Sequence, residues 1–453
     1  MKTMILGLLL VSLTANASTA ADVVRERNPE LAEHVAALEP MKNRAGKYYF
    51  PDPRLVSADA QVLLIDRLLG GEDEPAVQVA LAYALDEMGV RCERLEAALK
   101  HERGECGKEA SWAGGGIVSP LYPWRYEEAI SRLAEWSEGR YPALANRLTG
   151  ETGIDPEYRQ TGLLYLHVDD EADAVAWARQ RGKPLVRVDA DFVYGKEPHL
   201  AAGLDDGLWM PTLGSIRNPR LGQALRARLR TLPKVAVHEG CRVERLVVER
   251  GRVTGVQTAG GHFGAARVIV CGGAWSGRLL GEVGVALPVR PVKGQMMLYK
   301  TPLTSGCRQL LERVVLKDGR YLIPRADGRV LIGSTLEEAD FDKTPTAAAH
   351  ASLHASAVAM LPALAECEVE HHWAGLRPGA RLPFIGEVPG IAGLFVNAGH
   401  YRNGLVLAPA ATHLLVDQLL GREPIVDTAP YRVPASTDHE PAMLAQQATP
   451  NWR

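Results

Sequence analysis

The sequence has few cysteines and no C-x-x-C pair. The six cysteines lie far apart in a chain of 453 residues. This spacing argues against a structural zinc site and against a compact disulfide framework, because both need closely spaced cysteines. We expect ordinary reduced thiols at Cys92, Cys106, Cys241, Cys271, Cys307 and Cys367. The neighbours His371 and His372 would face opposite sides of a strand, so we predict no metal site there either.

The sequence also lacks a long block of Lys or Arg, and its formal net charge is −3. A surface that binds nucleic acid or an anionic membrane concentrates positive charge, so we expect neither partner. The length fits two or three domains, and 46% hydrophobic with 23% charged residues is typical of a globular chain with a sizeable core. The expected partner is therefore a small molecule, and a homo-oligomer is possible.

The most informative stretch is Gly399 to Pro409, GHYRNGLVLAP. It lies between an aliphatic run, Leu394 to Val396, and a helical pattern from Ala410 to Leu420. A strand, a glycine-containing turn and a helix in this order make a loop whose backbone N–H groups point at a ligand. Upstream, the stretch Trp373 to Gly379, WAGLRPG, supplies a second arginine, Arg377, in a turn that Gly and Pro should fix. Two guanidinium groups could then converge on one carboxylate.

A third motif, Glu109 to Ile117, contains three consecutive glycines, and Ser119 to Tyr126 follows it. Small residues let a backbone approach a ligand closely, although a flexible turn is the alternative interpretation. Together the three motifs resemble the FAD-dependent amino-acid oxidase superfamily, and most closely the glycine oxidases of thiamine biosynthesis. The resemblance runs from about Glu102 to about Arg422. The first hundred residues do not share it.

The resemblance implies an α/β fold with an α+β substrate part. A discontinuous Rossmann-type FAD domain would be interleaved with a mostly antiparallel substrate domain. The implied FAD-binding domain comprises residues 101–160, 217–293 and 379–430. The implied substrate domain comprises residues 161–216 and 294–378. The remaining parts are an atypical N-terminal region with a degenerate βαβ unit, 1–100, and a C-terminal tail, 431–453.

Hydrophobic periodicity predicts the elements within these domains. Helices are expected over Glu127–Ser137, Tyr141–Leu148 and Leu221–Leu232, in addition to the one from Ala410. An alternating strand region is expected to begin with Leu163–His167. A further strand is expected over Val235–Val237. Three strands joined by glycine-containing turns are expected over Val243–Val248, Gly251–Val256 and Ala266–Trp275. A large antiparallel sheet is expected from Val289–Lys300 and from Val314–Ile332, with a hairpin turn at Asp327-Gly328.

The resemblance also implies the roles of individual residues. Arg377 would bind the substrate carboxylate and Tyr321 would add a hydrogen bond, whereas Arg402 would lie near the flavin ring and the substrate. A strand tyrosine is more often core packing, so the role of Tyr321 depends on the motif. The residues expected to contact FAD are Glu102, Arg103, Ala110, Ser111, Gly115, Gly116, Ile117, Val243, His400, Tyr401, Arg402, Asn403, Gly404, Leu405 and Val406.

The implied reaction is the oxidative deamination of glycine or another small amino acid, such as sarcosine or D-alanine. Hydride would pass from the substrate Cα to the flavin, and O₂ would be reduced to H₂O₂. The product would supply the thiazole branch of thiamine synthesis. Thr335-Leu336 stands where glycine oxidases often carry a methionine, so the sequence does not determine which small amino acid the pocket accepts. Two alternatives also remain: a D-amino-acid or sarcosine dehydrogenase with another electron acceptor, and a homologue with impaired FAD binding.

The N-terminal region departs from the family pattern. Thr3 to Gly7 could be the first flavin-domain strand, but a leucine run, Leu8 to Leu10, replaces the G-x-G-x-x-G loop that lets the backbone approach a diphosphate. A βαβ unit expected over Val62 to Leu95 is the other candidate. Its helix would begin near Glu72 to Glu74, whose charges repel a diphosphate. We therefore expect weak FAD binding that improves when Glu72 and Glu74 are changed to Gln or Gly.

Residues 1–20 also resemble a secretory signal peptide. An apolar run from Met4 to Thr14 is followed by small residues from Ala15 to Ala20. The run is too short to cross a bilayer as a helix. An exported chain would cross unfolded and find FAD outside, and no twin-arginine signal precedes the run. The expected location is therefore the cytoplasm, with export as the alternative.

Overall fold

The computed structural model describes residues 41–42, 48–49, 98–302 and 309–434. The chain divides into two compact units, one of residues 1–99 with Pro233–Ala236 and one of Lys100–Leu232 with Val237–Arg453. In the first unit, the antiparallel strands β1 (Met41–Lys42) and β2 (Tyr48–Tyr49) pair with each other. The signal-like residues 1–20, the βαβ unit expected over Val62 to Leu95 and its acidic residues Glu72 to Glu74 lie outside the described residues.

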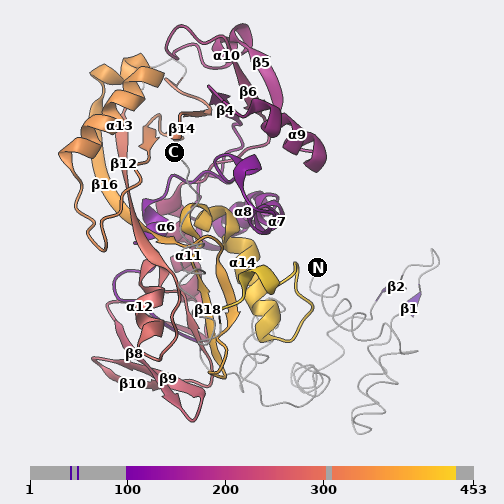
Figure 1. Cartoon of the computed structure of the whole chain (residues 1–453), viewed down its shortest axis with the longest axis vertical. Helices are drawn as coiled ribbons and strands as arrows, with labels where there is room; N and C mark the ends of the chain where they lie inside the picture. Colours follow the sequence, from indigo (N-terminus) through magenta and orange to yellow (C-terminus); the bar gives the residue numbers. More distant parts are fainter. Residues whose placement is uncertain (1–40, 43–47, 50–97, 303–308, 435–453) are drawn as a thin grey trace. The chain divides into compact units, whose positions relative to one another are not determined.

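An eight-stranded sheet carries the candidate substrate residues Tyr321 and Arg377. Its strand order is β16-β12-β15-β14-β13-β4-β6-β5, and every neighbouring pair is antiparallel except β13 with β4. The predicted large antiparallel sheet is thus confirmed, and its long strands β12 and β16 run side by side in Figure 1. The strands are β4 (Leu163–Leu166), β5 (Val186–Asp189), β6 (Asp206–Met210), β12 (Arg290–Lys300), β13 (Val314–Lys317), β14 (Arg320–Pro324), β15 (Val330–Gly333) and β16 (Glu368–Gly379).

The two faces of this sheet carry different cores. Successive strand residues point to opposite faces, so Ile332 packs in the cluster that contains residues of α13 (Ala347–Met360), whereas Leu331 packs with Tyr321 on the other face. The strand expected to alternate from Leu163 is β4, but all of its residues are buried, because one face packs in the cluster that contains Tyr321 and the other in the cluster that contains residues of α13. The predicted hairpin turn is confirmed, with Gly328 at φ +85°.

Four helices enclose a third apolar cluster, which includes Leu133, Leu148, Ala224 and Leu414. These helices are α7 (Glu128–Glu138), α8 (Tyr141–Thr152), α11 (Asn218–Thr231) and α14 (Gly404–Leu419). The predicted helices are confirmed, although the last begins at Gly404 rather than at Ala410 and contains Pro409. Pro409 has no N–H to offer the Leu405 carbonyl one turn earlier. That carbonyl accepts a hydrogen bond from the Tyr141 hydroxyl instead, so the helix continues through the proline.

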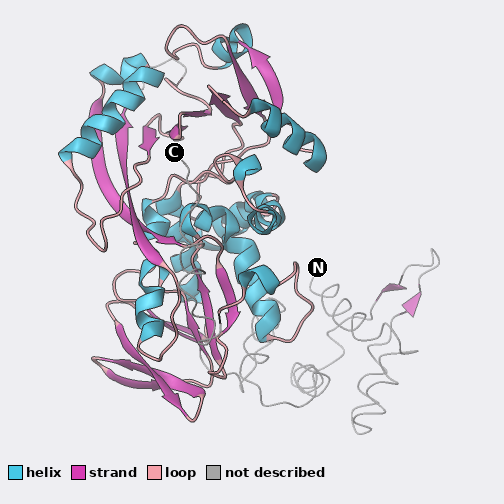
Figure 2. Ribbon diagram, in the orientation of Figure 1, coloured by secondary structure: helices cyan, strands magenta, loops and turns pink. Residues whose placement is uncertain are grey.

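The remaining strands form smaller sheets, of which the β8-β9-β10 meander is visible as a separate sheet in Figure 2. The third strand predicted for that meander, β11, instead pairs in parallel with β18, as expected for a Rossmann-type sheet. These strands are β3 (Ala98–His101), paired with β7 (Val235–His238); β8 (Val243–Glu249), β9 (Arg252–Thr258) and β10 (Gly261–Gly264); and β11 (Val268–Val270), β17 (Phe384–Glu387) and β18 (Leu394–Ala398).

Short helices complete the described residues. The α-helices are α6 (Ala110–Ala113), α9 (Glu171–Arg181), α10 (Ala190–Lys196) and α12 (Ser276–Gly281). The 3-10 helices are η3 (Pro123–Arg125), η4 (Gly273–Trp275), η5 (Pro362–Glu366), η6 (Tyr401–Asn403) and η7 (Ala429–Tyr431). Across the described ranges, we find no helix with the length and apolar character needed to cross a membrane.

Candidate active site

The triple-glycine loop after α6 packs tightly against the start of α11. Gly116 has φ +91°, and a Cβ atom there would lie 1.9 Å from the Ile216 carbonyl oxygen. A Cβ atom at Gly114 would lie 2.7 Å from Nδ2 of Asn218. The Ile216 N–H donates to the Gly116 carbonyl at 2.8 Å. A side chain at Gly116 would therefore displace the loop, which explains the glycine.

The same loop lies against one face of the eight-stranded sheet. A Cβ atom at Gly115 would lie 3.0 Å from Cδ1 of Ile323 and 3.0 Å from Cε2 of Tyr321. On β16, the Trp373 indole N–H donates to the Ala113 carbonyl at 3.1 Å. We call the loop Gly114–Gly116 the flavin loop. The structure therefore brings the flavin loop and the predicted substrate residue Tyr321 together. We call this side of the sheet the site face.

Strand register lines up Trp373, Met296, Gly333 and Tyr321 across four neighbouring strands of the site face. Gly333 makes room for the phenol, because a Cβ atom there would lie 2.7 Å from the Tyr321 hydroxyl and 2.8 Å from Cε of Met296. Among the described residues, the hydrogen-bond partner of the Tyr321 hydroxyl is the Met296 sulfur alone, at 4.0 Å. A thioether is a weak acceptor, so the hydroxyl proton remains available to a ligand.

Arg377 lies on a strand and not in the predicted turn. It belongs to β16 and pairs with Val292 of β12. The Gly- and Pro-containing sequence continues as a strand because β16 is at the edge of the sheet, where Pro378 costs no ladder hydrogen bond. The Arg377 guanidinium lies flat over Gly294, since a Cβ atom at Gly294 would be 2.1 Å from Nη1 of Arg377.

The Arg377 guanidinium is held by neutral groups. Its Nη2 donates to Oγ of Ser334 at 2.7 Å, and its Nη1 donates to the carbonyls of Lys293 and Thr335 at 3.3 Å. No carboxylate among the residues that the structure describes forms an ion pair with it. Burial, followed by the nearby charge of Arg402, lowers the pKa of Arg377. A cation in this setting favours an anionic ligand, which would relieve both effects.

The second predicted arginine, Arg402, lies in η6 between β18 and α14. The preceding Tyr401 has φ +46°, a backbone conformation that non-glycine residues keep mainly at functional sites. Burial raises the pKa of Tyr401, while the charges of Arg402 and Arg377 oppose this shift. The strand–loop–helix arrangement predicted from Gly399 is thus present, and its Arg402 is an electrostatic neighbour of Arg377 on β16. Within the described ranges, no carboxylate pairs with Arg402 either.

Two buried polar atoms beside these loops lack hydrogen-bond partners in the described part of the chain. They are Nε2 of His400 and Oδ1 of Asn218. Burial lowers the pKa of His400 to about 4, so its ring is neutral. The described residues contain thirteen such atoms, so an atom without a partner indicates a ligand only where other observations agree. Oδ1 of Asn218 lies 3.0 Å from the position of a Cβ atom at Gly116, so it is available to a polar group bound at the glycine loop, such as a flavin.

The other predicted cofactor residues form a second group near β3. The Glu102 carbonyl accepts from Cys241 N–H at 2.8 Å, which places it close to Val243 at the start of β8. Oε1 of Glu102 accepts only from Gly104 N–H, at 3.3 Å, and can accept further bonds. Arg103 is engaged within the protein, because it donates to Glu109 at 2.6 Å and lies 4.1 Å from the Trp275 ring centroid.

The remaining predicted residues are placed by α6 and α14. Ser111 is exposed on α6, and Ile117 is buried just after the glycine loop. Asn403 and Val406 are buried, and the backbone of α14 begins at Gly404. The residues from Gly115 to Ile117 lie beside Tyr321. The residues Glu102 and Arg103 directly follow β3, and Val243 begins β8.

Sequence reasoning missed Gly294, Gly333 and Asn218. An isolated glycine within a strand pattern is a sign of close approach by another group. Gly294 carries that signal within a predicted strand, whereas Gly333 directly follows the predicted strand region that ends at Ile332. Asn218 carries no such signal, because an asparagine at the start of a helix is ordinary capping. Its position beside Gly114 and Gly116 depends on the fold.

The glycine loop, the parallel β11–β18 pair and two arginines that form no ion pair within the described residues are features expected of a flavin-dependent oxidoreductase. The family described as "DAO: FAD dependent oxidoreductase" matches residues 79–418, more than half of the chain. The chain therefore belongs to this family, and its cofactor is FAD.

Relatives and solved structures agree with this family. The chain is 53% identical to the glycine oxidase of Pseudomonas putida over 332 residues, which is 73% of this chain and 90% of that protein. It is 30% identical to the bifunctional protein ThiO/ThiG of Synechocystis sp. over 352 residues, 76% of this chain and 50% of that protein. The crystal structure of glycine oxidase from Geobacillus kaustophilus matches with a TM-score of 0.70 and 31% identity, covering 76% of this chain and 92% of that one.

Proposed function

We propose that this protein is an amino-acid oxidase that converts glycine to the corresponding imine or oxoacid, ammonia and H₂O₂, and that supplies the thiazole branch of thiamine synthesis. The observation that carries the proposal is the Arg377 guanidinium without a carboxylate, on the same sheet face as the flavin loop. The glycine oxidase of Pseudomonas putida and the ThiO/ThiG protein of Synechocystis sp. support the substrate and the pathway. When bound, FAD accepts hydride from the substrate and passes electrons to O₂.

In this proposal, Arg377 binds the substrate carboxylate as a fork, and Tyr321 donates its free hydroxyl proton to the same group. Arg402 adds positive charge next to the reacting centre, which favours negative charge that develops there. Met296 lies next to Gly333 in the same cross-strand row, and Trp373 lies next to Met296. These large side chains favour a substrate as small as glycine, sarcosine or D-alanine.

The proposal needs no protein carboxylate as a base. Glu337 is the carboxylate whose charge acts on Arg377, but its oxygens accept hydrogen bonds from Nε2 of Gln295 at 2.9 and 3.0 Å and from Oγ1 of Thr335. It is therefore occupied by protein donors. A glycine bound with a neutral amine loses hydride without a general base, and the two arginines hold its carboxylate in place.

Two measurements on the purified protein test the function. Glycine added without O₂ should bleach the flavin absorbance to completion, and glycine in air should yield one H₂O₂ for each ammonia. Bleaching without H₂O₂ would instead identify a dehydrogenase that uses another acceptor. A protein whose flavin spectrum does not respond to glycine, sarcosine or D-alanine would refute the proposal.

We also propose that the enzyme acts in the cytoplasm, where FAD is available to the folding chain. Its small amino-acid substrate and O₂ are both present there. Recovery of the protein from a secreted or periplasmic fraction, with a new N-terminus at Ser18 or Ala21, would place it outside the cytoplasm instead.

A further inference from the structure

Three alternate residues, two on β14 and one directly after it, face the flavin loop. Tyr321 and Ile323 of β14 both contact the position of Gly115. Arg325 follows directly after β14, and its Nη2 donates to the Gly115 carbonyl at 2.8 Å. The strand that carries the candidate substrate residue Tyr321 therefore also holds the backbone of the flavin loop.

Arg325 binds a second carbonyl on the other side of that loop. Its Nη1 donates to the Ile216 carbonyl at 3.2 Å, and Ile216 itself donates through its N–H to Gly116 at 2.8 Å. The planar guanidinium thus joins two backbone segments that are already bonded to each other. A guanidinium is suited to this role because its donors are fixed in one plane.

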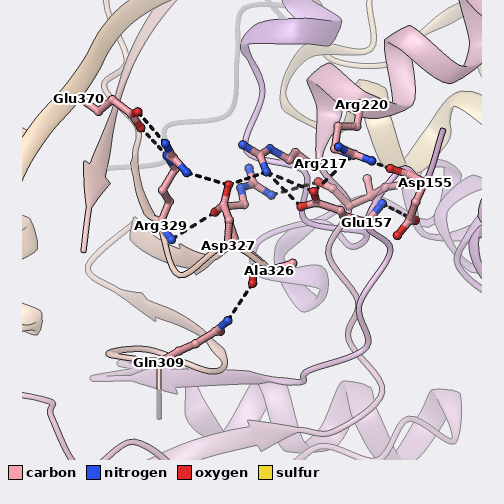
Figure 3. Close-up of polar contacts among 11 residues, drawn as sticks. Asp155, Glu157, Arg217, Arg220, Gln309, Ala326, Asp327, Arg329 and Glu370 are labelled. Carbon is pink, nitrogen blue, oxygen red and sulfur yellow. Dashed lines mark hydrogen bonds and ion pairs between the residues drawn. The ribbon is translucent and has the colours of Figure 1, made fainter. Parts of the chain in front are cut away.

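Arg325 is buried, with 6% of its surface exposed. Among the described residues, no carboxylate forms an ion pair with it, and the charges that act on it belong to a chain of ion pairs shown in Figure 3. In that chain, Arg217 lies 3.2 Å from Glu157 and 2.9 Å from Asp327, and Arg329 lies 3.0 Å from Asp327. Burial and then Arg217 lower the pKa of Arg325 to about 10, and Glu157 and Asp327 oppose the shift. Arg325 therefore stays charged at neutral pH.

We propose that Arg325 is a positioning residue that sets the spacing between the flavin loop and the strand that carries Tyr321. This inference rests on the proposed function, in which Tyr321 holds the substrate and the loop supports the flavin. Its guanidinium fixes Gly115 at the place where Tyr321 and Ile323 touch it. Loss of the fork lets the loop move relative to the substrate, and a misplacement of about 1 Å lowers a reaction rate by about a hundredfold.

Three variants of the full-length FAD-loaded protein test this inference. In Arg325→Met, the rate constant of flavin reduction by glycine without O₂ should fall at least about tenfold, while the apparent Kd for glycine, which depends on Arg377, changes less than about threefold. The visible circular dichroism of the bound flavin should change as well. Arg325→Lys keeps the charge but cannot form the planar fork, so its reduction rate should lie between those of wild type and Arg325→Met.

The matched control is Arg329→Met, in the same hairpin. Arg329 pairs with Asp327 and with Glu370 but contacts no loop carbonyl, so its loss should lower the Tm and leave the reduction rate and the flavin dichroism unchanged. If the Arg325 and Arg329 variants lose only Tm, Arg325 is not a positioning residue. If Arg325→Met does not fold, Arg325→Lys decides, and a wild-type reduction rate in it overturns the inference. If the wild-type protein does not oxidise glycine, the proposed function fails, whereas the flavin dichroism of the variants still tests the fork.

Discussion

The two faces of the eight-stranded sheet are built from the same strands and differ in the side chains that line them. The face covered by α13 is lined by large apolar side chains such as Leu322, Ile332 and Leu353, all fully buried. The site face places Gly294 and Gly333 between its large residues, and the space holds the Arg377 guanidinium and the Tyr321 phenol. Adjacent residues, Ile332 and Gly333, thus serve opposite purposes.

The difference indicates that one face of the sheet stabilises the fold and the other forms the candidate site. On the α13 face, burial of apolar surface stabilises the fold by about 25 cal/mol per Å². On the site face, part of that apolar burial is replaced by polar groups that the protein leaves without strong partners. Natural proteins depart from ideal packing mainly at functional sites. Substitutions on the α13 face should therefore change stability, and those on the site face should change substrate binding.

The largest effect is expected from Leu353→Ala on α13. Leu353 is 0% exposed in the core between α13 and the sheet. Its truncation removes buried methyl groups and leaves a cavity, which should lower the free energy of unfolding by about 2–5 kcal/mol. Urea denaturation of the FAD-loaded protein measures this loss. The KM for glycine should stay within about twofold of wild type, and a large rise in KM would show that the two faces are coupled.

The next largest effect is expected from Arg377→Ala on the site face. Removal of a charge-assisted fork should cost about 2–4 kcal/mol of substrate binding, equivalent to a rise in KM of about thirtyfold to several hundredfold. The flavin absorbance spectrum should remain normal. Steady-state kinetics with glycine measure the change, and Arg329→Ala, which removes an arginine already paired with carboxylates, is the control. Equal KM values for wild type and Arg377→Ala would remove Arg377 from the substrate site.

A smaller effect is expected from Tyr321→Phe. Within the part of the chain that the structure describes, the hydroxyl has only the Met296 sulfur as a partner, so its removal should leave stability nearly unchanged. Loss of its hydrogen bond to the substrate carboxylate should cost about 1.5–3 kcal/mol, equivalent to a rise in KM of about tenfold to a hundredfold. Calorimetry and kinetics on the same preparation separate the two quantities. A fall in Tm with an unchanged KM would make Tyr321 a core residue.

The sequence allowed prediction of those parts of the site that depend on local pattern. The Asp327-Gly328 hairpin and the strand–loop–helix around Gly399 follow from turn residues and periodicity. The sequence predicts a turn at Arg377, whereas the structure has a strand. The difference depends on the sheet, because β16 pairs with β12 on one side and Pro378 therefore lies at an edge. Likewise, α14 starts before Pro409 because of Tyr141, 264 residues from Leu405 in the sequence. Contacts between such distant segments cannot be read from local pattern.

The smallest effect is expected from Gly294→Ala, which adds one methyl group to the site face. That methyl would lie 2.1 Å from Nη1 and 2.4 Å from Cζ of Arg377, so the guanidinium must move off the sheet. Overpacking of this kind costs about 1–3 kcal/mol, and the displaced fork should raise the KM for glycine by about fivefold to a hundredfold.

The same chemical change at Gly222 is the control for Gly294→Ala. Gly222 lies within α11, where a Cβ atom would meet nothing within 4 Å. Alanine there should stabilise the helix by about 0.5–1 kcal/mol and leave KM unchanged. The two variants therefore differ only in whether the added methyl reaches Arg377. If Gly294→Ala loses stability without a rise in KM, the guanidinium has an alternative position from which it still binds the substrate, and the glycine serves packing alone.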